Sequence, residues 1–284
     1  MTAATKRRTK LAGTHAILIV LSIVMIYPVL WMLSSSFKPT SEIFSSPGLL
    51  PDHWTLENYV SGWQGVGGVS FGTFFLNSLI ISVCVVIGSL FIASLTGFAF
   101  ARLKFKLRGV MFAMMLATIM LPIQVTLIPQ YVIFHKLGWV NTFLPLIVPS
   151  FVGVSITPFF IFLMVQFIRG LPKELDEAAT IDGCSTFQLF WRIVLPLSKP
   201  AMITISIFAF YWTWDDFFSQ LIYLSDPNKF TASTGLNLFL SNAGNSQWGA
   251  LFAMSILSVI PVIVVFVIFQ KHLVKGVSTT GMKL

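Results

Sequence analysis

The side chains that could take part in catalysis are few, and their spacing matches no enzyme. The chain has 10 Asp and Glu, 4 His and 2 Cys among 284 residues. It lacks the HExxH spacing of zinc proteases, and its GxSxG sequence, GVSFG at 68–72, ends a Gly-rich segment and follows no strand, whereas the nucleophile elbow of serine hydrolases follows one. The ending KGVSTTGMKL comes nearest to a phosphate-binding loop, but it lacks the Gly-Lys-Ser/Thr step. The histidines are too scattered for a metal site, and Cys84 and Cys184 suggest no disulfide framework. We therefore expect no catalytic residue, and no metal or cofactor bound by this chain.

The composition places the chain in a membrane. Hydrophobic residues make up 56% of it, charged residues 10%, and the mean hydropathy is +0.85. Ordinary soluble domains carry about 25% charged residues. The net charge of +8 could suggest a nucleic-acid partner, but the basic residues stand between long apolar stretches and form no single basic surface. We expect the lipid bilayer, and not nucleic acid, as the partner of these stretches.

Six apolar stretches are long enough to cross a bilayer. A spanning helix needs about 20 apolar residues, and a helix satisfies its own backbone hydrogen bonds in lipid. The expected spans are 14–35, 73–100, 109–130, 142–168, 200–223 and 249–270. The expected fold class is therefore an all-α integral membrane protein with six transmembrane helices. The basic start of the first stretch is also typical of a secretory signal, but its apolar core exceeds the usual length of about 7–15 residues, so we expect an uncleaved helix.

The basic residues determine the expected orientation. Lys and Arg gather at the N-terminus, between the second and third spans, in the loop 169–200 and in the C-terminal tail. The alternate side holds only Lys38, Lys136 and Lys229. Loops rich in Lys and Arg stay in the cytoplasm. We therefore expect cytoplasmic segments at 1–13 and 271–284 around a six-helix domain at 14–270.

A few polar side chains within the spans could line a path for a solute. Asn77 and Gln124 either face such a path or form hydrogen bonds between helices. Asp215, which is followed by Asp216 at the outward end of the fifth span, is a candidate because ionisable groups within a membrane are often functional. Its tryptophan and phenylalanine neighbours equally fit an anchor at the level of the lipid headgroups. Both interpretations stay open for each residue.

The loop 169–200 carries the most informative pattern, RGLPKELDEAATIDGCSTFQLFWRIVLPLSKP. The acidic residues near its start favour a short helix, and Asp182-Gly183 indicates a turn. A second short helix with an apolar face follows, and Leu195-Pro196 is expected to end it. Both helices are too short to span, so they should lie on the cytoplasmic surface as a helix-turn-helix. Such a shape suits insertion into a groove on a partner protein.

The same loop resembles the cytoplasmic motif of ABC importer permeases, EAA-x3-G-x9-I-x-LP, at every fixed position. Those positions are Glu177, Ala178, Ala179, Gly183, Ile193, Leu195 and Pro196, and the family's Asp before the glycine is present as Asp182. The later order of Trp214-Asp215-Asp216-Phe217, Gly235, Trp248, Pro261 and Gly276 is similar to that of the carbohydrate-uptake subclass. The chain departs from the subclass at Asp215, where Asn is frequent, and at Val277, where Leu is frequent. The resemblance covers nearly the whole chain.

The resemblance implies a permease subunit in the cytoplasmic (inner) membrane of a bacterium or archaeon, working in an ATP-driven importer of a sugar or oligosaccharide. Its implied partners are a second permease, two ATPase subunits and an extracytoplasmic solute-binding protein. ATP and Mg would bind on the ATPase subunits. The motif residues named above would form the coupling contact with the ATPase.

The resemblance also gives a role to the last outward loop. Asn237, Asn242 and Asn245 would lie where this loop meets the binding protein. A plain connector between two spans would have a similar composition, so that interpretation stays open.

The C-terminal tail acquires a role in the same way. Gly276, Thr279, Thr280 and Gly281 would belong to a tail that reaches into the interface of the ATPase dimer. A basic tail could also serve only to hold the helix end at anionic lipid.

An ion-coupled secondary transporter of small polar solutes is the alternative from another class. Such proteins usually show internal repeats and helices that are broken near the bilayer midplane. The chain shows no convincing repeat, and its spans hold few acidic groups for coupling to protons or sodium. The ABC permease is therefore the expected function.

Overall fold

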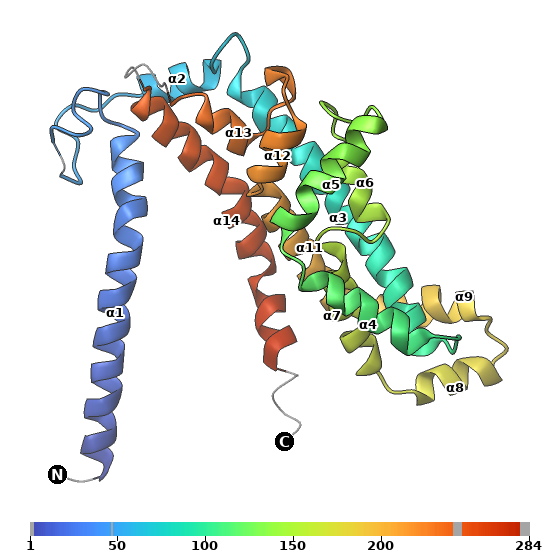
Figure 1. The fold of residues 1–284 in the computed structure, drawn as a ribbon. Helices are drawn as coiled ribbons and strands as arrows, with labels where there is room; N and C mark the ends of the chain where they lie inside the picture. The colour runs from blue at the N-terminus through green and yellow to red at the C-terminus, as the bar shows by residue number, and fades with distance from the viewer. Residues whose placement is uncertain (1–2, 47, 241–245, 279–284) are drawn as a thin grey trace. The chain divides into compact units, whose positions relative to one another are not determined.

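Helices form almost all of the regular structure in residues 3–46, 48–240 and 246–278, which the computed structural model describes (Figure 1). Within these ranges the β pairing is limited to an isolated bridge between Val66 and Val69. In chain order the α-helices are α1 (Ala3–Ser35), α2 (Glu57–Gln64), α3 (Phe71–Arg102), α4 (Arg108–Ile119), α5 (Ile123–Lys136), α6 (Leu144–Phe151), α7 (Thr157–Arg169), α8 (Glu174–Ile181), α9 (Thr186–Leu189), α10 (Leu195–Leu197), α11 (Lys199–Trp214), α12 (Phe218–Tyr223), α13 (Ala232–Asn237) and α14 (Trp248–Ser278). The expected all-α class is confirmed.

The chain divides into two compact units. Unit 1 consists of Met1–Phe71 and Leu236–Val259, and unit 2 consists of Gly72–Gly235 and Ile260–Leu284. Unit 2 contains both the loop 169–200 and the expected path residues, so it carries the candidate functional site.

Three of the expected spans are continuous helices. Leu11–Ser35 of α1, Phe71–Arg102 (α3) and Trp248–Lys271 of α14 are long and apolar enough to cross a membrane, in agreement with the first, second and sixth expected spans. No residue in the most apolar 18-residue part of the α1 span is buried within the chain, and Ile23 and Met25 are 62% and 78% exposed. Apolar surface of that extent requires cover by lipid or by another protein.

The other three expected spans are broken, so the expectation of one continuous helix in each is wrong. The stretch 109–130 divides into α4 and α5, which meet at 101°. The stretch 142–168 divides into α6 and α7, and 200–223 divides into α11 and α12. The described residues contain three continuous helices that could cross a membrane, or up to five spans if each bent pair of helices counts as one. The sequence predicts six.

Each break has a local cause. Pro122 precedes α5 in an extended conformation, and its ring disfavours a helix at the residue before it. Between α6 and α7 the chain passes through Gly153 and Ser155, whose φ angles of 78° and 64° are left-handed. Between α11 and α12 there is neither Pro nor Gly. There the carboxylate of Asp216 accepts the N–H of Ser219 at 3.1 Å and favours the start of a new helix.

Helices α3, α7 and α11 form the core of unit 2. Phe160 and Met164 of α7 and Ile205 of α11 are fully buried in it. Gly97 lets α3 approach α7 closely, because a Cβ at this position would lie 2.6 Å from Cγ of Met164. Phe190 from the loop 169–200 belongs to the same core. Apolar packing therefore holds this loop to the transmembrane helices.

Two of the three lysines on the expected outward side are held by backbone carbonyls. Lys38 is fully buried, and its ammonium group donates to the carbonyls of Ser46 at 2.6 Å and Gly48 at 2.5 Å. Lys229 donates to the carbonyl of Asn141 at 2.8 Å. Burying an ammonium group is unfavourable unless it is hydrogen-bonded. These two lysines therefore serve the local fold.

Candidate functional site

The hairpin at 174–197 begins with α8 and turns at a left-handed glycine. Gly183 has a φ angle of 77°. Its N–H donates to the carbonyl of Thr180 at 3.1 Å, and the N–H of Cys184 donates to the carbonyl of Ala179 at 2.9 Å. These two bonds define a Schellman helix end, which places a left-handed residue, usually glycine, at this position. The expected turn at Asp182-Gly183 is confirmed.

The second arm of the hairpin runs from α9 through a π-helical turn into α10. Ser185 starts it with a capping box, in which its hydroxyl accepts the Gln188 N–H and its own N–H donates to Oε1 of Gln188 at 2.8 Å. A π-helix at Phe190–Val194 is followed by α10 at Leu195–Leu197. The helix ends at Leu197, directly after the expected end at Leu195-Pro196.

Two contacts fix the hairpin to the rest of unit 2. Phe190 is 4% exposed, and its ring lies 5.2 Å from that of Phe98 in α3. Arg102, the last residue of α3, places its Nε 2.8 Å from Oδ2 of Asp176. Its Nη2 also donates to the carbonyl of Leu171 at 2.9 Å. In Figure 1, α8 and α9 accordingly lie at the end of unit 2 where α3 ends and α4 begins. A displacement of the hairpin must therefore move α3 or break these contacts.

The hairpin also leaves apolar side chains uncovered. Ile181 is 86% exposed, Phe187 68% and Trp191 49%. The motif residues have the following burial: Glu177, Ala178, Asp182, Gly183 and Pro196 are exposed, Ile193 and Leu195 are partly buried, and Ala179 is buried. Aromatic and aliphatic side chains exposed together on one small element are typical of a docking surface.

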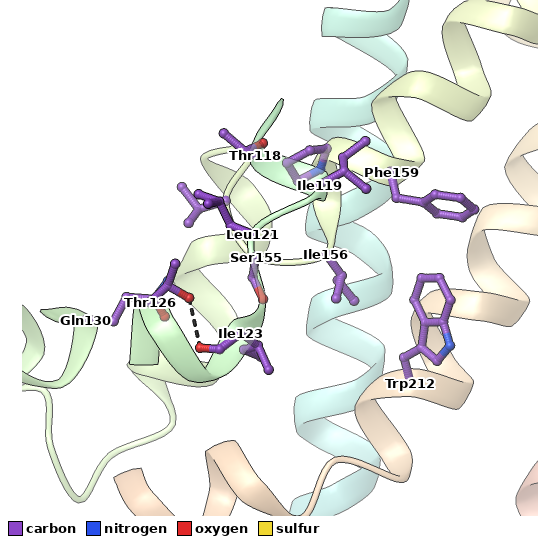
Figure 2. A pocket seen from close by; sticks show the side chains of 13 residues that line it. Thr118, Ile119, Leu121, Ile123, Thr126, Gln130, Ser155, Ile156, Phe159 and Trp212 are labelled. Carbon is purple, nitrogen blue, oxygen red and sulfur yellow. Dashed lines mark hydrogen bonds between the residues drawn. The ribbon is translucent and has the colours of Figure 1, made fainter. Parts of the chain in front are cut away.

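Two adjoining cavities lie at the helix breaks of unit 2. The first has a volume of about 440 Å³. Figure 2 shows Phe159 and Trp212 on one side of it and Thr126 and Gln130 on the other. The second has a volume of about 380 Å³ and shares Gln130 and Trp212 with the first. Its wall includes the unwound segments 154–156 and 215–217. Unwound backbone at membrane depth is tolerated where it lines a cavity, as in transport paths.

The second cavity is the more polar one, and we name it the polar cavity. Its polar lining residues are Gln130, Ser150, Ser155, Thr157, Thr213, Asp215, Asp216, Ser219, Gln220 and Tyr223. No lysine, arginine or histidine of the described chain lines it. Gln220 is held in place because its amide donates to the Thr213 carbonyl at 3.2 Å and accepts the Ser233 hydroxyl at 2.7 Å. The described residues include no group of three or more His, Cys, Asp or Glu that could hold a metal ion.

The structure separates the three expected path residues. Asp215 lines the polar cavity. Asn77 lines neither cavity, and its amide donates to the carbonyls of Asn228 and Phe230, both at 2.9 Å. Gln124 is exposed and also lines neither cavity. Sequence reasoning missed Gln130, Thr157 and Tyr223. No spacing in the sequence marks these residues, since only the helix breaks bring them together.

The segment that follows α12 is fixed by polar contacts within unit 2. The side-chain oxygen of Asn141 accepts the N–H groups of Ser225 at 3.2 Å and Asp226 at 3.0 Å. The Asp226 carboxylate accepts the backbone N–H of Asn228 at 3.0 Å and its side-chain amide at 3.1 Å. These hydrogen bonds, helped by the charge of Lys229, hold the pKa of Asp226 below its ordinary value. They do so because they stabilise the ionised carboxylate.

Of the three asparagines expected in the binding-protein loop, only Asn237 lies within the described residues. Asn237 ends α13 and is exposed. Asn242 and Asn245 lie outside the described residues.

The expected tail is shortened by the last helix. α14 extends to Ser278, past the expected end at 270, and includes Gly276. Thr279, Thr280 and Gly281 lie outside the described residues.

Comparisons with known proteins agree with these features. Residues 89–279 match the family model described as the binding-protein-dependent transport system inner membrane component. The chain is 34% identical over 277 residues to the diacetylchitobiose uptake system permease protein NgcG of Streptomyces coelicolor, covering 97% of this chain and 90% of that protein. It is 33% identical over 266 residues to the trehalose/maltose transport system permease protein MalG of Thermococcus litoralis, covering 93% and 94%. In fold it is similar to a chain of a bacterial ABC transporter involved in the import of the acidic polysaccharide alginate, with a TM-score of 0.82 at 20% identity over 95% of this chain and 98% of that one.

Proposed function

Because the chain belongs to the family of binding-protein-dependent transport system inner membrane components, we propose that it is a permease subunit of an ATP-driven ABC importer for a sugar or oligosaccharide. The two relatives compared above are named as permeases for diacetylchitobiose and for trehalose or maltose. The alginate importer shares the fold at 20% identity and carries no weight for the substrate. The chain is an integral membrane protein with a transport role.

The observation that carries the proposal is the construction of the 174–197 hairpin. Its turn requires the motif glycine, since Gly183 has a φ angle of 77°. Its inner side is fixed to the transmembrane helices through Phe190 and Arg102. Its outer side exposes Ile181 and Phe187. A rigid hairpin with an apolar tip can pass the movement of a docked protein to the helices behind it.

The docked protein in this proposal is the ATPase subunit of the importer. ATP and Mg bind there, and closure of the ATPase dimer moves the hairpin as a rigid body. The exposed Glu177 suits a basic partner on the ATPase, and the small exposed Ala178 permits close approach of its backbone.

The remaining partners and the orientation follow from the family and the distribution of charge. A second permease completes the path, two ATPase subunits hydrolyse ATP, and an extracytoplasmic binding protein delivers the solute. Both termini are cytoplasmic, because the basic segments lie on the side of the hairpin. The loop with Asn237, Asn242 and Asn245 meets the binding protein. The segment 279–284 reaches the interface of the ATPase dimer. Both roles are supported by the small and polar residues of these segments.

The test is solute uptake by the complete importer in proteoliposomes with ATP in the lumen. The importer is oriented with its ATPase subunits inside, and a protonophore collapses the proton gradient. We expect uptake to require internal ATP and added binding protein and to survive the protonophore. Uptake that stops with the protonophore and ignores ATP would overturn the proposal.

An ion-coupled transporter is the second candidate, and one observation favours it. Three of the expected spans are broken, and broken helices are frequent in secondary transporters. The same uptake measurement decides between the two, because an ion-coupled protein follows the gradient and does not respond to ATP.

A further inference from the structure

We propose that the turn between α3 and α4, residues 103–107, binds the headgroup of an acidic phospholipid at the cytoplasmic surface of the membrane. The inference goes beyond the proposed function, because it concerns the lipid around the importer and not its cargo. Only the choice of the cytoplasmic leaflet rests on the orientation proposed above. The inference depends on three features: an exposed leucine in an unfavourable conformation, an apolar stripe that continues from it, and two lysines without partners.

Leu107 stands at a position where leucine is locally unfavourable. It is the N-cap of α4, its φ angle is 61°, and its side chain forms no capping hydrogen bond. Polar residues such as Asp and Asn cap helices better, and Asn also adopts left-handed conformations more readily. The Leu107 side chain is 70% exposed, so it gains little from packing within the chain. A leucine at this place therefore indicates a contact outside the chain.

An apolar stripe on α4 continues from Leu107 along the helix. Val110, Met111 and Met114 are likewise exposed. Together with Leu107 they follow the i, i+3, i+4, i+7 spacing of one helix face. Phe112 points the other way and packs against the core of unit 2. Because α4 belongs to a bent pair of helices that could cross a membrane, lipid acyl chains are the cover that fits this stripe.

Lys104 and Lys106 are exposed in the same turn, and neither ammonium group has a hydrogen bond or an ion pair to another described residue. Arg108 differs, because its guanidinium donates to the carbonyls of Leu103 at 3.1 Å and Ala101 at 3.4 Å. These bonds hold the turn against the end of α3. The two lysines are therefore available to a ligand, whereas the arginine serves the local fold.

The charge at this turn selects an anion. The sequence holds no Asp or Glu from 58 to 173, and Asp176 of the adjoining hairpin is already paired with Arg102. A headgroup phosphate could accept from both lysines while the acyl chains lie along the α4 stripe. A free phosphate would satisfy the lysines but leave the stripe uncovered. Basic side chains beside exposed apolar ones therefore favour an acidic phospholipid.

The test uses the complete importer in phosphatidylcholine liposomes that contain a trace of photoreactive lipid. This lipid is phosphatidylglycerol or phosphatidylcholine with a diazirine in its acyl chain, and mass spectrometry measures its capture by α4, with residues 19–26 of α1 as the internal reference. We expect α4 to prefer phosphatidylglycerol, and Lys104→Gln and Lys106→Gln each to reduce this preference about fivefold. Lys136→Gln should leave it unchanged, because this matched control removes an exposed lysine at the end of another helix, α5.

Two outcomes of this measurement would overturn the proposal. The first is an equal preference in the parent importer, Lys104→Gln and Lys106→Gln. The second is an absence of capture of either lipid by α4 in the parent importer, which would show that a partner protein covers the stripe. ATP-driven uptake is measured separately, so either outcome leaves the proposed function untouched.

Leu107→Asn separates lipid binding from a structural role. Because asparagine suits the left-handed N-cap better than leucine, the midpoint of thermal unfolding in detergent should stay unchanged or rise. Capture of both lipids by α4 should nevertheless fall severalfold, since the exposed apolar side chain is lost. Unchanged capture in Leu107→Asn would contradict the proposed contact.

Competition identifies the source of the phosphate. An excess of inorganic phosphate, compared with sodium chloride at equal ionic strength, should not displace phosphatidylglycerol from α4, because free phosphate cannot cover the apolar stripe. Displacement would assign the two lysines to a soluble phosphate and overturn the lipid proposal.

Discussion

The guanidinium Nε of Arg102 lies 2.8 Å from Oδ2 of Asp176, and so an ion pair joins the end of α3 to the first turn of α8. The two side chains are 6% and 21% exposed. The same guanidinium donates to the carbonyl of Leu171, just before the hairpin. One residue at the end of a transmembrane helix thus holds the entrance of the hairpin that we assign to ATPase coupling.

Removing this arginine should loosen the hairpin while leaving the transmembrane core folded. For Arg102→Ala we expect a loss of about 1.5–3 kcal/mol in local stability, because a largely buried carboxylate loses its charged partner. Amide hydrogen exchange in 171–183 should then accelerate roughly 10- to 150-fold, and substrate-stimulated ATP hydrolysis should fall. Arg102→Lys should restore part of both. Unchanged exchange in Arg102→Ala would show that the ion pair does not hold the hairpin.

Gly183 should tolerate asparagine but not valine. Its φ angle is 77°, a conformation that costs a β-branched residue at least about 1–2 kcal/mol and that asparagine adopts more readily. No atom lies within 4 Å of a Cβ added there, so the backbone conformation alone decides the outcome. We expect Gly183→Val to insert normally but to lose substrate-stimulated ATP hydrolysis, and Gly183→Asn to keep most of it. Equal activity of the two variants would contradict this explanation.

Gly88 should be required for the contact between α3 and α6. A Cβ at Gly88 would lie 2.5 Å from Cδ2 of Phe151 and would also overlap Ser150. We expect Gly88→Ala to destabilise the protein by about 1–3 kcal/mol, as overpacking does, measured as a lower midpoint of thermal unfolding in detergent. Gly109→Ala is the control, because Gly109 lies in α4 with nothing within 4 Å. It should be stabilising by about 0.4–1 kcal/mol. A midpoint for Gly88→Ala at or above that of the parent protein would refute the close contact.

Asp226 should make the turn after α12 sensitive to acid. Its hydrogen bonds to Asn228 lower its pKa in the folded protein. The carboxylate therefore stabilises the turn at any pH above the ordinary aspartate pKa of about 3.9, and this contribution disappears as the pH falls through the lower folded pKa. We expect hydrogen exchange at the Asn228 amide, corrected for its intrinsic pH dependence, to lose protection only below about pH 3.9. Asp226→Ala should lack that protection at every pH. If the parent protein lost this protection at a higher pH, a group other than Asp226 would be responsible for it.

The cavity shows where prediction from sequence reaches its limit. Asp215 was identified as a candidate because a carboxylate in an apolar stretch is conspicuous by itself. Thr157 and Tyr223 were missed because a single hydroxyl in an apolar stretch is ordinary. Within the described residues neither hydroxyl has a hydrogen-bond partner, and this becomes visible only when the neighbouring side chains have been placed.

The sequence alone determined the all-α membrane class, the family and the position of the turn at Gly183. These depend on local properties: the length of apolar stretches, the spacing of motif residues and the conformational freedom of glycine. The tertiary structure decided which spans are broken, how the hairpin is anchored and which side chains meet in the cavity. The break between α11 and α12 has no Pro or Gly, and Arg102 and Asp176 are far apart along the chain. Such features depend on contacts between distant segments, and contacts of that kind leave no periodic signal in a single sequence.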